Sequence, residues 1–492
     1  MTISNRSSDS FCRKREGADD GRPRTAWGMT SLPAQLSGDN EIDPGVVKEF
    51  ALSYNQEFFC MLDEGDSRGA FGDRHTLVGG WRLTGPIDVA VLQAALDDMV
   101  VRHEILRTSI ARQAVPRYQV VHPPSSARLL VRELADSVGA GREFRCEQLM
   151  TEIEAEPFPV SNLPLLRAVL GRFDEQDAVL VLTVHHIAGD AWSMQVLIRD
   201  LLSCYARRRG FDVTLHEVHQ YREYCREQRA DADSAALRPF TEFWRETLRD
   251  ARMFRLPMRP PAVPSAAGSY AMQNFRIAGD SISTVGRLAA DTRCSPFMVL
   301  LSAFYLLAHR ITGDTDLVVP PFTTGRTDSR FHDTVGPFMN FLPVRTDIAG
   351  CRTFRDVLGR TRVNCLAAYS HDIPFALIEP LAPELFSTDP RDGRTPMAFE
   401  MVQAPVQTAA EQVGDLCYAE VHTRLLAEGD CPDIPNGMLW ALNLISPQEL
   451  IGTVQYSRAE FESTAIGRLV EDFRQVLAES VAAPDAPLRP AP

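Results

Sequence analysis

A predicted strand that runs directly into a predicted helix constrains the fold of this chain most. Residues 178–184 form an apolar, β-branched run, which is typical of a strand buried on both faces. The large side chains that follow recur at helical spacing, at Trp192, Val196, Leu197, Leu201 and Tyr205. Three arginines at 207–209 and then Gly210 mark a helix C-terminus. The residues between the two elements should therefore lie at the rim of a sheet, where active sites are often built.

The polar residues at this junction could carry chemistry. They comprise His185, His186 and Asp190, with Gly189 before the aspartate and Ala191, Trp192 and Ser193 after it. An imidazole titrates near neutral pH, so it can take a proton from an amine or hydroxyl that attacks an acyl group. Asp190 could bond that imidazole, or pair with an arginine and hold the loop. Spacing alone leaves open a buried structural pair, a catalytic pair and a metal site; metal is least favoured because no Glu, Cys or third His stands close in the sequence.

The length of the chain, 492 residues, favours two domains of roughly 200 residues each. Both halves alternate predicted strands and helices, so the fold class should be α/β. Four prolines at Pro257, Pro260, Pro261 and Pro264 indicate a linker. The predicted organisation is a disordered leader (1–42), a first half (43–220), a helical connector and linker (221–269), a second half (270–483) and a flexible tail (484–492).

Composition and charge exclude several classes of function. The formal net charge of −14 disfavours nucleic acid or an anionic membrane as the main partner. No apolar run approaches the ~20 residues of a membrane span, and the leader lacks the apolar core of a secretion signal. The ten cysteines are scattered, without a Cys-x-x-Cys pair. We therefore expect a cytoplasmic protein with reduced thiols, without a zinc site or a disulfide framework.

Other catalytic motifs are weak or missing. The segment Gly65-Asp66-Ser67-Arg68-Gly69 has the letters of a nucleophile elbow, but no apolar strand leads into it, so a polar surface turn is favoured. The chain has neither a Walker loop nor a dinucleotide fingerprint after a strand, which argues against ATP and NAD as ligands.

Five further segments are arranged in order around the two histidines. They are Ser53-Tyr54-Asn55-Gln56, Arg102-His103-Glu104-Ile105-Leu106-Arg107-Thr108, Val335-Gly336-Pro337-Phe338-Met339-Asn340-x-Leu342-Pro343-x-Arg345, Asp372-Ile373-Pro374-Phe375 and Arg391-Asp392-Gly393-Arg394-Thr395-Pro396. Together with His185-His186-x-x-x-Asp190, they resemble the motifs of the condensation domains of nonribosomal peptide synthetases, in the same order. The resemblance spans about residues 45–483.

This resemblance implies an α/β fold of two chloramphenicol-acetyltransferase-like halves, which form a V-shaped pseudo-dimer with a central tunnel. It also implies an acyltransferase that joins an acyl donor to an amine or hydroxyl acceptor. The donor would be a thioester on the phosphopantetheine arm of an acyl or peptidyl carrier protein, and the acceptor either free or carrier-bound. No bound cofactor and no metal are expected.

The resemblance also implies roles for individual residues. His186 would be the catalytic histidine, as a general base or by orienting the nucleophile, and His185 would support it. Asp190 is expected to form a structural ion pair, with Arg345 as the favoured partner and Arg102 or Arg107 as alternatives. Asn340 is expected to line the tunnel.

Two departures from the family pattern affect these expectations. Ala191 stands where the family usually has glycine. A backbone that needs positive φ would resist alanine, so either this position has an ordinary conformation or the loop is altered, with Gly189 taking the flexible role. Ala191 could also narrow the space for the acceptor. In addition, no adenylation or carrier segment follows the last predicted helix, which predicts a free-standing enzyme acting in trans.

Three functions remain open from the sequence. The first is a carrier-dependent condensation enzyme. The second is an acyl-CoA-dependent acyltransferase of the same superfamily, or an epimerase-like relative. The third is a non-catalytic recruiting module, which the retained histidine motif disfavours. Donor, acceptor and the choice between amide and ester cannot be inferred from these residues.

Overall fold

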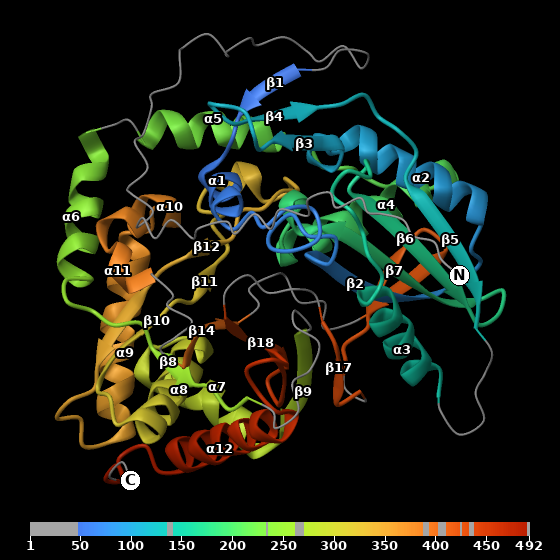
Figure 1. Ribbon diagram of the computed structural model, residues 1–492. Coiled ribbons are helices and arrows are strands. Elements are labelled where there is room, and N and C mark those ends of the chain that lie inside the picture. The colour runs from blue at the N-terminus through green and yellow to red at the C-terminus, as the bar shows by residue number, and fades with distance from the viewer. Residues whose placement is uncertain are drawn as a thin grey trace, which may run out of the picture. The chain divides into compact units, whose positions relative to one another are not determined.

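The computed structural model describes residues 48–134, 141–232, 235–260, 270–386, 393–401, 410–423, 426–431 and 437–489 (Figure 1). The predicted leader (1–42) lies outside the described residues, as does most of the proline-rich linker. Helices and strands are mixed throughout, which confirms the α/β class.

The predicted strand is an inner strand of the first sheet, and the junction lies at its end. This six-stranded sheet has the order β15-β16-β2-β7-β6-β5. Strand β7 (Asp177–His185) pairs antiparallel with both β2 (Thr76–Thr84) and β6 (Leu166–Arg172), and all of its residues are buried. Its side chains alternate between two apolar clusters: Leu180 and Leu182 pack with α2 (Val89–Arg102) and α4 (Ala191–Arg208), while Val179 and Val181 pack with α3 (Arg142–Glu154). The apolar run is thus a strand buried on both faces, as predicted.

The second half is built on another six-stranded sheet, of order β17-β9-β19-β18-β14-β8. Helix α8 (Pro296–Thr312) and helix α12 (Ser463–Ala482) supply much of the apolar core beside it (Figure 1). The ends of α8 carry typical helix signals: Ser295 caps its N-terminus by accepting a hydrogen bond from the Met298 N–H, and Pro296 occupies the first turn. Gly313 ends the helix in the left-handed conformation, with φ of 76°.

Strands β15 (Glu411–Val413) and β16 (Leu416–Glu420) come from the predicted second half but belong to the first sheet. Strand β16 pairs antiparallel with β2, in the register Cys417 to Thr84 through Glu420 to Trp81. The sequence-based boundaries assign this segment to residues 270–483 and do not anticipate the exchange. The physical reason is the edge of the first sheet: without β16, strand β2 would present a row of unpaired backbone groups.

The remaining elements complete both halves. In the first part of the chain they are β1 (Lys48–Ala51), α1 (Tyr54–Met61), β3 (Thr108–Ala111), β4 (Tyr118–Val121), β5 (Arg128–Glu133), α5 (Tyr221–Ala232) and α6 (Arg238–Thr247). The second part adds β8 (Arg255–Pro257), β9 (Tyr270–Ala278), α7 (Asp280–Thr292), β10 (Asp316–Val319), β11 (Phe322–Thr323), β12 (Asn340–Phe341), β13 (Val344–Asp347), α9 (Phe354–Ser370), α10 (Phe375–Ile378), α11 (Pro383–Phe386), β14 (Arg394–Met401), β17 (Glu428–Asp430), β18 (Met438–Ser446) and β19 (Glu449–Ser457). Short 3-10 turns also occur, at Glu104–Arg107, His186–Ala188, Ala235–Leu237, Ser329–Phe331 and Glu379–Leu381.

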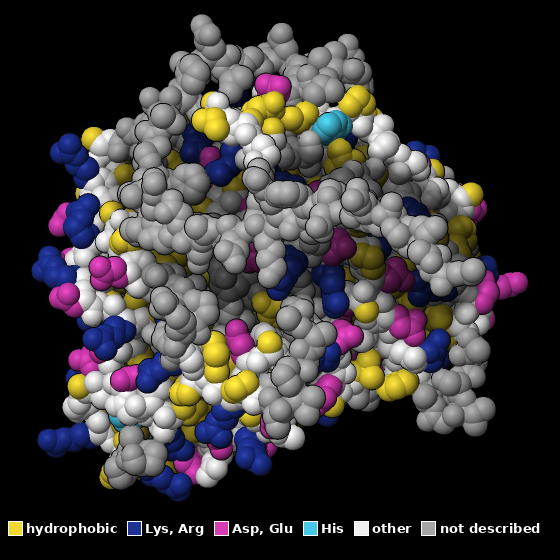
Figure 2. Space-filling model, viewed as in Figure 1, with side chains coloured by type: hydrophobic (Ala, Val, Ile, Leu, Met, Phe, Trp, Pro, Cys, Tyr) yellow, Lys and Arg dark blue, Asp and Glu magenta, His cyan; other side chains and the backbone are white. Residues whose placement is uncertain are grey.

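In the described ranges, no single helix combines the length and apolar character that crossing a membrane requires. Helices α7 and α8 meet both requirements only when they are taken together, and the two are bent by 108° at the break between them. This match rests on length and composition alone. On the face drawn in Figure 2, basic and acidic side chains are interspersed.

Candidate functional site

The two histidines lie where strand β7 gives way to helix α4. His185 is the last residue of β7, and His186 begins the single turn His186–Ala188 that precedes Gly189. The Nε2 of His185 donates to the Gly72 carbonyl (3.0 Å), and its Nδ1 accepts from the Ile187 N–H (3.4 Å). Both ring nitrogens of His185 are therefore occupied by the backbone. Burial lowers its pKa to about 4, so this ring is a neutral anchor for the turn.

His186 is bonded differently from its neighbour. Its Nδ1 is buried and has no well-aligned hydrogen-bond partner. Burial lowers the pKa of His186, and this effect is opposed by hydrogen bonding of the ring to the backbone of His186, by the Asp190 carboxylate and by hydrogen bonding to the backbone of Gly189. The imidazole is thus neutral at neutral pH, the form in which it can accept a proton.

A third histidine, which the sequence motifs did not indicate, completes the cluster. The ring of His75, just before β2, stacks on His186 with a centroid separation of 4.7 Å and an interplanar angle of 15°. Phe59 of α1 presents its ring to both imidazoles, at 5.8 and 5.9 Å. The signal that could have located His75 is strand pairing, because β2 and β7 are antiparallel with Thr76 opposite His185.

Both oxygens of the Asp190 carboxylate accept structural hydrogen bonds. Its Oδ1 accepts from the backbone N–H (2.8 Å) and hydroxyl (2.7 Å) of Ser193 and from Nη2 of Arg326 (3.0 Å). Its Oδ2 accepts from the Phe338 N–H (3.0 Å). No imidazole is among these donors. Asp190 caps helix α4 and joins it to the segment 326–338 of the second half.

Arg326 is the ion-pair partner of Asp190, which corrects the expectation of Arg345, Arg102 or Arg107. Its side chain has no solvent exposure, and that of Asp190 has 7%. The Arg326 Nη1 donates to the carbonyls of Phe331 (2.9 Å) and Thr334 (2.8 Å), and its guanidinium lies 3.9 Å from the centre of the Phe338 ring. The buried charge is therefore paired and covered, and both Nη atoms are hydrogen-bonded, while the Nε is buried without a partner.

The three arginines that were expected as partners of Asp190 pair with other groups instead. Arg345 on β13 forms an ion pair with Asp316 (2.6 Å) on the neighbouring strand β10. Arg102 donates to Asp200 of α4 (2.7 Å). Arg107 donates to the Val100 carbonyl (3.2 Å) and lies 3.8 Å from Glu104. Each has a nearer acceptor than Asp190, so motif membership alone did not identify the partner.

The residue before Arg326 gives a sequence signal in retrospect. Gly325 has φ of +61°, and a Cβ there would lie 1.8 Å from the Phe338 carbonyl oxygen. Only glycine fits this close approach of two backbones. The pair Gly325-Arg326 therefore marks a loop that is pressed against the 336–338 segment.

Other residues of the junction also contact the second half. The Trp192 indole N–H donates to the His332 carbonyl (2.9 Å). The Ser193 hydroxyl accepts from the Gly336 N–H (3.1 Å). The first motif meets the same segment, because the Asn55 amide donates to the Pro337 carbonyl (2.7 Å). Motifs far apart in the sequence thus converge on residues 336–338.

Asn340 forms hydrogen bonds to another motif, the segment 372–375. Its Nδ2 donates to Asp372 Oδ1 (2.7 Å) and to the Ile373 carbonyl (2.8 Å), and its Oδ1 accepts from the Phe375 N–H (2.8 Å). The amide is buried and all of these bonds are internal. The structure places Asn340 as a support of the 372–375 segment; the expected tunnel-lining role stays a prediction.

The backbone around Asp190 has no glycine requirement. Gly189 has φ of −169°, which is extended backbone that any residue adopts, so its expected flexible role is not needed. Ala191 is the first residue of helix α4. Among the described residues, the non-glycine positions with positive φ are Asp250 and Arg293. Of the two possibilities for Ala191, the structure therefore shows the ordinary conformation.

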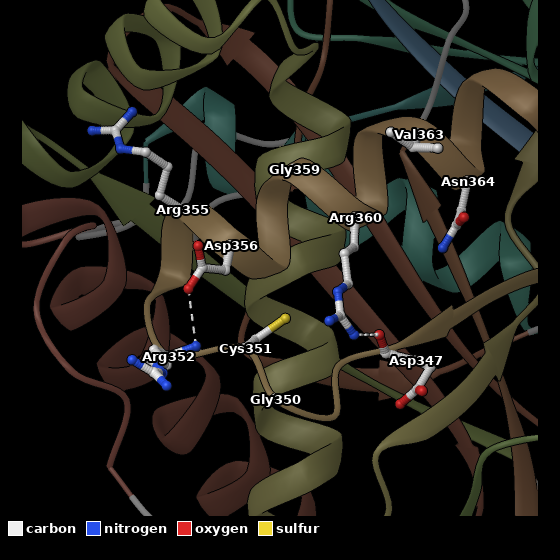
Figure 3. A pocket seen from close by; sticks show the side chains of 10 residues that line it. All are labelled: Asp347, Gly350, Cys351, Arg352, Arg355, Asp356, Gly359, Arg360, Val363 and Asn364. Carbon is white, nitrogen blue, oxygen red and sulfur yellow. Dashed lines mark hydrogen bonds between the residues drawn. The ribbon is translucent and has the colours of Figure 1, made fainter.

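A surface cavity of about 770 Å³ lies elsewhere, along the first turns of α9 (Figure 3). Arg352, Arg355 and Arg360 line it together with Asp347 and Asp356. It contains neither a histidine nor any residue of the junction. Within the described ranges, no group of three or more His, Cys, Asp and Glu side chains is arranged to hold a metal ion.

Comparison with known proteins places most of the chain in one domain family. Residues 79–396 match the family model described as Condensation domain. The phosphinothricin tripeptide synthetase PhsC of Streptomyces viridochromogenes is 30% identical over 412 residues, which is 82% of this chain and 36% of that protein. The dimodular nonribosomal peptide synthase of Bacillus subtilis (strain 168) is 35% identical over 317 residues, covering 61% of this chain and 13% of that protein. The chain thus spans a minor part of the length of these relatives.

Solved structures extend the comparison to the fold. The SgcC5 protein from Streptomyces globisporus, in complex with (R)-(-)-1-(2-naphthyl)-1,2-ethanediol and sucrose, matches with a TM-score of 0.84 and 42% identity, covering 89% of this chain and 100% of that chain. The first condensation domain of the calcium-dependent antibiotic synthetase matches with a TM-score of 0.71 and 21% identity, covering 89% of this chain and 98% of that domain. These similarities confirm the predicted fold of two chloramphenicol-acetyltransferase-like halves.

The buried ion pair gives a first testable prediction. Replacement of Asp190 by alanine should lower the free energy of unfolding by roughly 3–5 kcal/mol, because Arg326 would stay buried without a counter-charge. Denaturant titration of the wild type and the variant measures the difference.

Asp328→Ala is a matched control for this experiment. Asp328 also caps a turn and pairs with an arginine, Arg330, but the two side chains are 41% and 52% exposed. Exposed pairs contribute little, so this variant should lose much less stability than Asp190→Ala. Equal losses in the two variants would contradict the structural role of the Asp190–Arg326 pair.

The buried histidines predict a loss of stability in acid. Unfolded histidine titrates at about 6.5, whereas the pKa of His185 is lowered to about 4 in the folded chain. As the pH falls below the unfolded value, the unfolded chain binds the proton first, so stability is complete above 6.5 and is lost toward 4. His185 alone should account for about 3 kcal/mol of this loss.

The variant His185→Gln isolates this contribution, because the glutamine amide can still donate to the Gly72 carbonyl. Between about pH 7.5 and pH 4, the wild type should lose about 3 kcal/mol more unfolding free energy than the variant. Denaturant titrations at several pH values measure both curves. Parallel curves would show that His185 is not held neutral.

Proposed function

Because the chain belongs to the condensation-domain family, we propose that it is an acyltransferase that joins a carrier-bound acyl thioester to an amine or hydroxyl acceptor. The setting would be nonribosomal peptide or related natural-product biosynthesis, with donor and acceptor delivered in trans, as to a free-standing condensation enzyme. The observation that carries the proposal is the contrast at the junction. His185 and Asp190 are buried and engaged in structural hydrogen bonds, whereas His186 is neutral and is the one of the three residues that is partly exposed.

In the proposed reaction, the acceptor nitrogen or oxygen attacks the thioester carbonyl carbon while the imidazole of His186 orients the nucleophile or takes its proton. The new C–N or C–O bond forms, the C–S bond breaks, and the proton leaves with the thiol. A thioester is already activated, so the enzyme has mainly to hold donor and acceptor together. Such proximity can contribute several kcal/mol to lowering the barrier, and general base catalysis adds typically 10²- to 10⁴-fold.

The neighbouring residues have positioning roles in this proposal. His185 fixes the turn from which His186 projects, through its bonds to Gly72 and Ile187. Asp190 and Arg326 hold the start of helix α4 against the second half. Loss of Asp190 should therefore reduce activity by disturbing the loop, without any proton transfer by the carboxylate.

A hydroxyl acceptor is supported by the bound ligand of one relative. SgcC5, at 42% identity over 89% of this chain, was solved with a 1,2-ethanediol derivative. An alcohol acceptor would give an ester, and an amine acceptor an amide. Both reactions need the same proton transfer, so the geometry at His186 suits either.

Offering the donor in two forms tests the proposed function. The full chain should convert an acyl group presented on the phosphopantetheine arm of a carrier protein, with a diol or an amine as acceptor, and mass spectrometry should detect the ester or amide. The same acyl group on coenzyme A should react much more slowly. Turnover with coenzyme A alone would contradict the carrier-dependent reaction and favour an acyl-CoA acyltransferase.

The variant His186→Ala tests the catalytic role in the same assay. It should lower kcat at least roughly 100-fold, with an unchanged circular dichroism spectrum. The wild type and His309→Ala, which changes a histidine of helix α8, are the active controls. A fully active His186→Ala variant would remove this imidazole from the mechanism, and an inactive wild type with every donor would favour a recruiting module.

A further inference from the structure

His75 is held beside His186 by the backbone. Strand pairing between β2 and β7 places Thr76 opposite His185. One residue beyond the strand ends, the His186 N–H donates to the His75 carbonyl oxygen (2.9 Å). The two side chains leave neighbouring backbones that are hydrogen-bonded to each other. Their stacking therefore follows from the register of the sheet.

The orientation of the His186 ring depends on packing. Its Nδ1 is buried and has no well-aligned hydrogen-bond partner. The ring contacts within the described residues are the parallel face of His75 and the ring of Phe59, which meets it at 65°. The torsion that sets an imidazole plane is broad and nearly two-fold. The face of His75 therefore supplies a surface that defines the plane of the His186 ring beyond what the backbone alone provides.

His75 is itself a rigid surface. Its Nδ1 donates to the Ala70 carbonyl oxygen (2.8 Å), and the residue is 6% exposed. The segment 69–75, which supplies this carbonyl, also supplies the Gly72 carbonyl that binds His185. Burial and the imidazoles of His186 and His185 hold the pKa of His75 well below its ordinary value. The ring is therefore neutral and presents its π face to His186.

We propose that His75 is a positioning residue whose stacked ring fixes the plane of the His186 imidazole and shields that face from water. The inference rests on the proposed function of His186 in acyl transfer. When His186 takes a proton, the positive charge lies over a neutral aromatic face, which is a favourable arrangement. Proton transfer then needs no movement of either ring.

The test compares two substitutions at one position. His75→Ala removes the stacked ring, whereas His75→Phe keeps a flat ring of similar size and removes the nitrogens. His309→Ala is the matched control, because His309 makes the same kind of bond, from Nδ1 to the Asp314 carbonyl (2.8 Å), in the other half of the chain. Thermal melting establishes that each variant is folded before kinetics are measured.

Loss of the ring should affect the rate more than binding. In His75→Ala, kcat should fall roughly 10- to 100-fold, with KM for donor and acceptor changed no more than about threefold. His75→Phe should stay within roughly threefold of the wild type in both parameters, and His309→Ala should match the wild type. A His75→Ala variant with wild-type kcat would overturn the proposal. If His75→Phe is as impaired as His75→Ala, a ring nitrogen of His75 is needed and stacking is not its function.

A titration without substrate separates this inference from the proposed function. The chain has 11 histidines, and ring-labelled histidine NMR can follow His186, assigned by the signal that His186→Ala lacks. Removing the His75 ring admits water, so the His186 midpoint should rise toward 6.5; in His75→Phe it should stay at the wild-type value. The other groups that act on the cluster, His185, Asp190 and Arg112, are unchanged in both variants.

The outcomes of the two experiments are distinguishable. If the wild type fails to react with any donor, the proposed function fails, but the NMR titration still reports whether His75 shields His186. If the His186 midpoint is the same in the wild type and in His75→Ala, the positioning role of His75 is wrong whatever the activity. A midpoint that rises in His75→Ala alone, together with the drop in kcat, supports it.

Discussion

The buried pair of Asp190 and Arg326 is the interaction on which the site depends. A charge without solvent exposure is costly unless it is paired and hydrogen-bonded. Arg326 meets this condition through Asp190, two backbone carbonyls and the face of Phe338. Asp190 in turn starts helix α4, and that helix begins where the histidine turn ends. The position of His186 relative to the second half is therefore determined by an ion pair that does no chemistry.

The division of tasks among the polar residues follows from which of their atoms are already bonded. Both nitrogens of His185 and both carboxylate oxygens of Asp190 take part in structural hydrogen bonds with the backbone, Ser193 and Arg326. Among these three residues, His186 is the one that combines a neutral ring with partial exposure. The imidazole of His75 stacks on that of His186, and in the proposed mechanism this contact helps to orient the reacting ring.

The sequence predicted what local patterning determines. The apolar run at 178–184 and the helical spacing after it located β7, α4 and the turn between them. Contacts between distant segments were harder to predict. The sequence favours Arg345 as the ion-pair partner of Asp190, but Arg345 pairs with a nearer carboxylate, that of Asp316. His75 lies 111 positions before His186 in the numbering, and strand register alone reveals that the two meet. The β16 exchange had no local signal, because any alternating strand could have covered the edge of β2.

The exchanged strand also determines the order in which the molecule can be completed. Residues 411–420 close the edge of a sheet whose other strands end at residue 185. During synthesis, more than 200 further residues must therefore leave the ribosome before β2 acquires its last neighbour. Until then the nascent first sheet presents an open edge, the kind of surface that chaperones and other unfinished chains bind. A fragment cut at the linker would carry that open edge permanently, so the two halves are a single folding unit and cannot be studied as independent pieces.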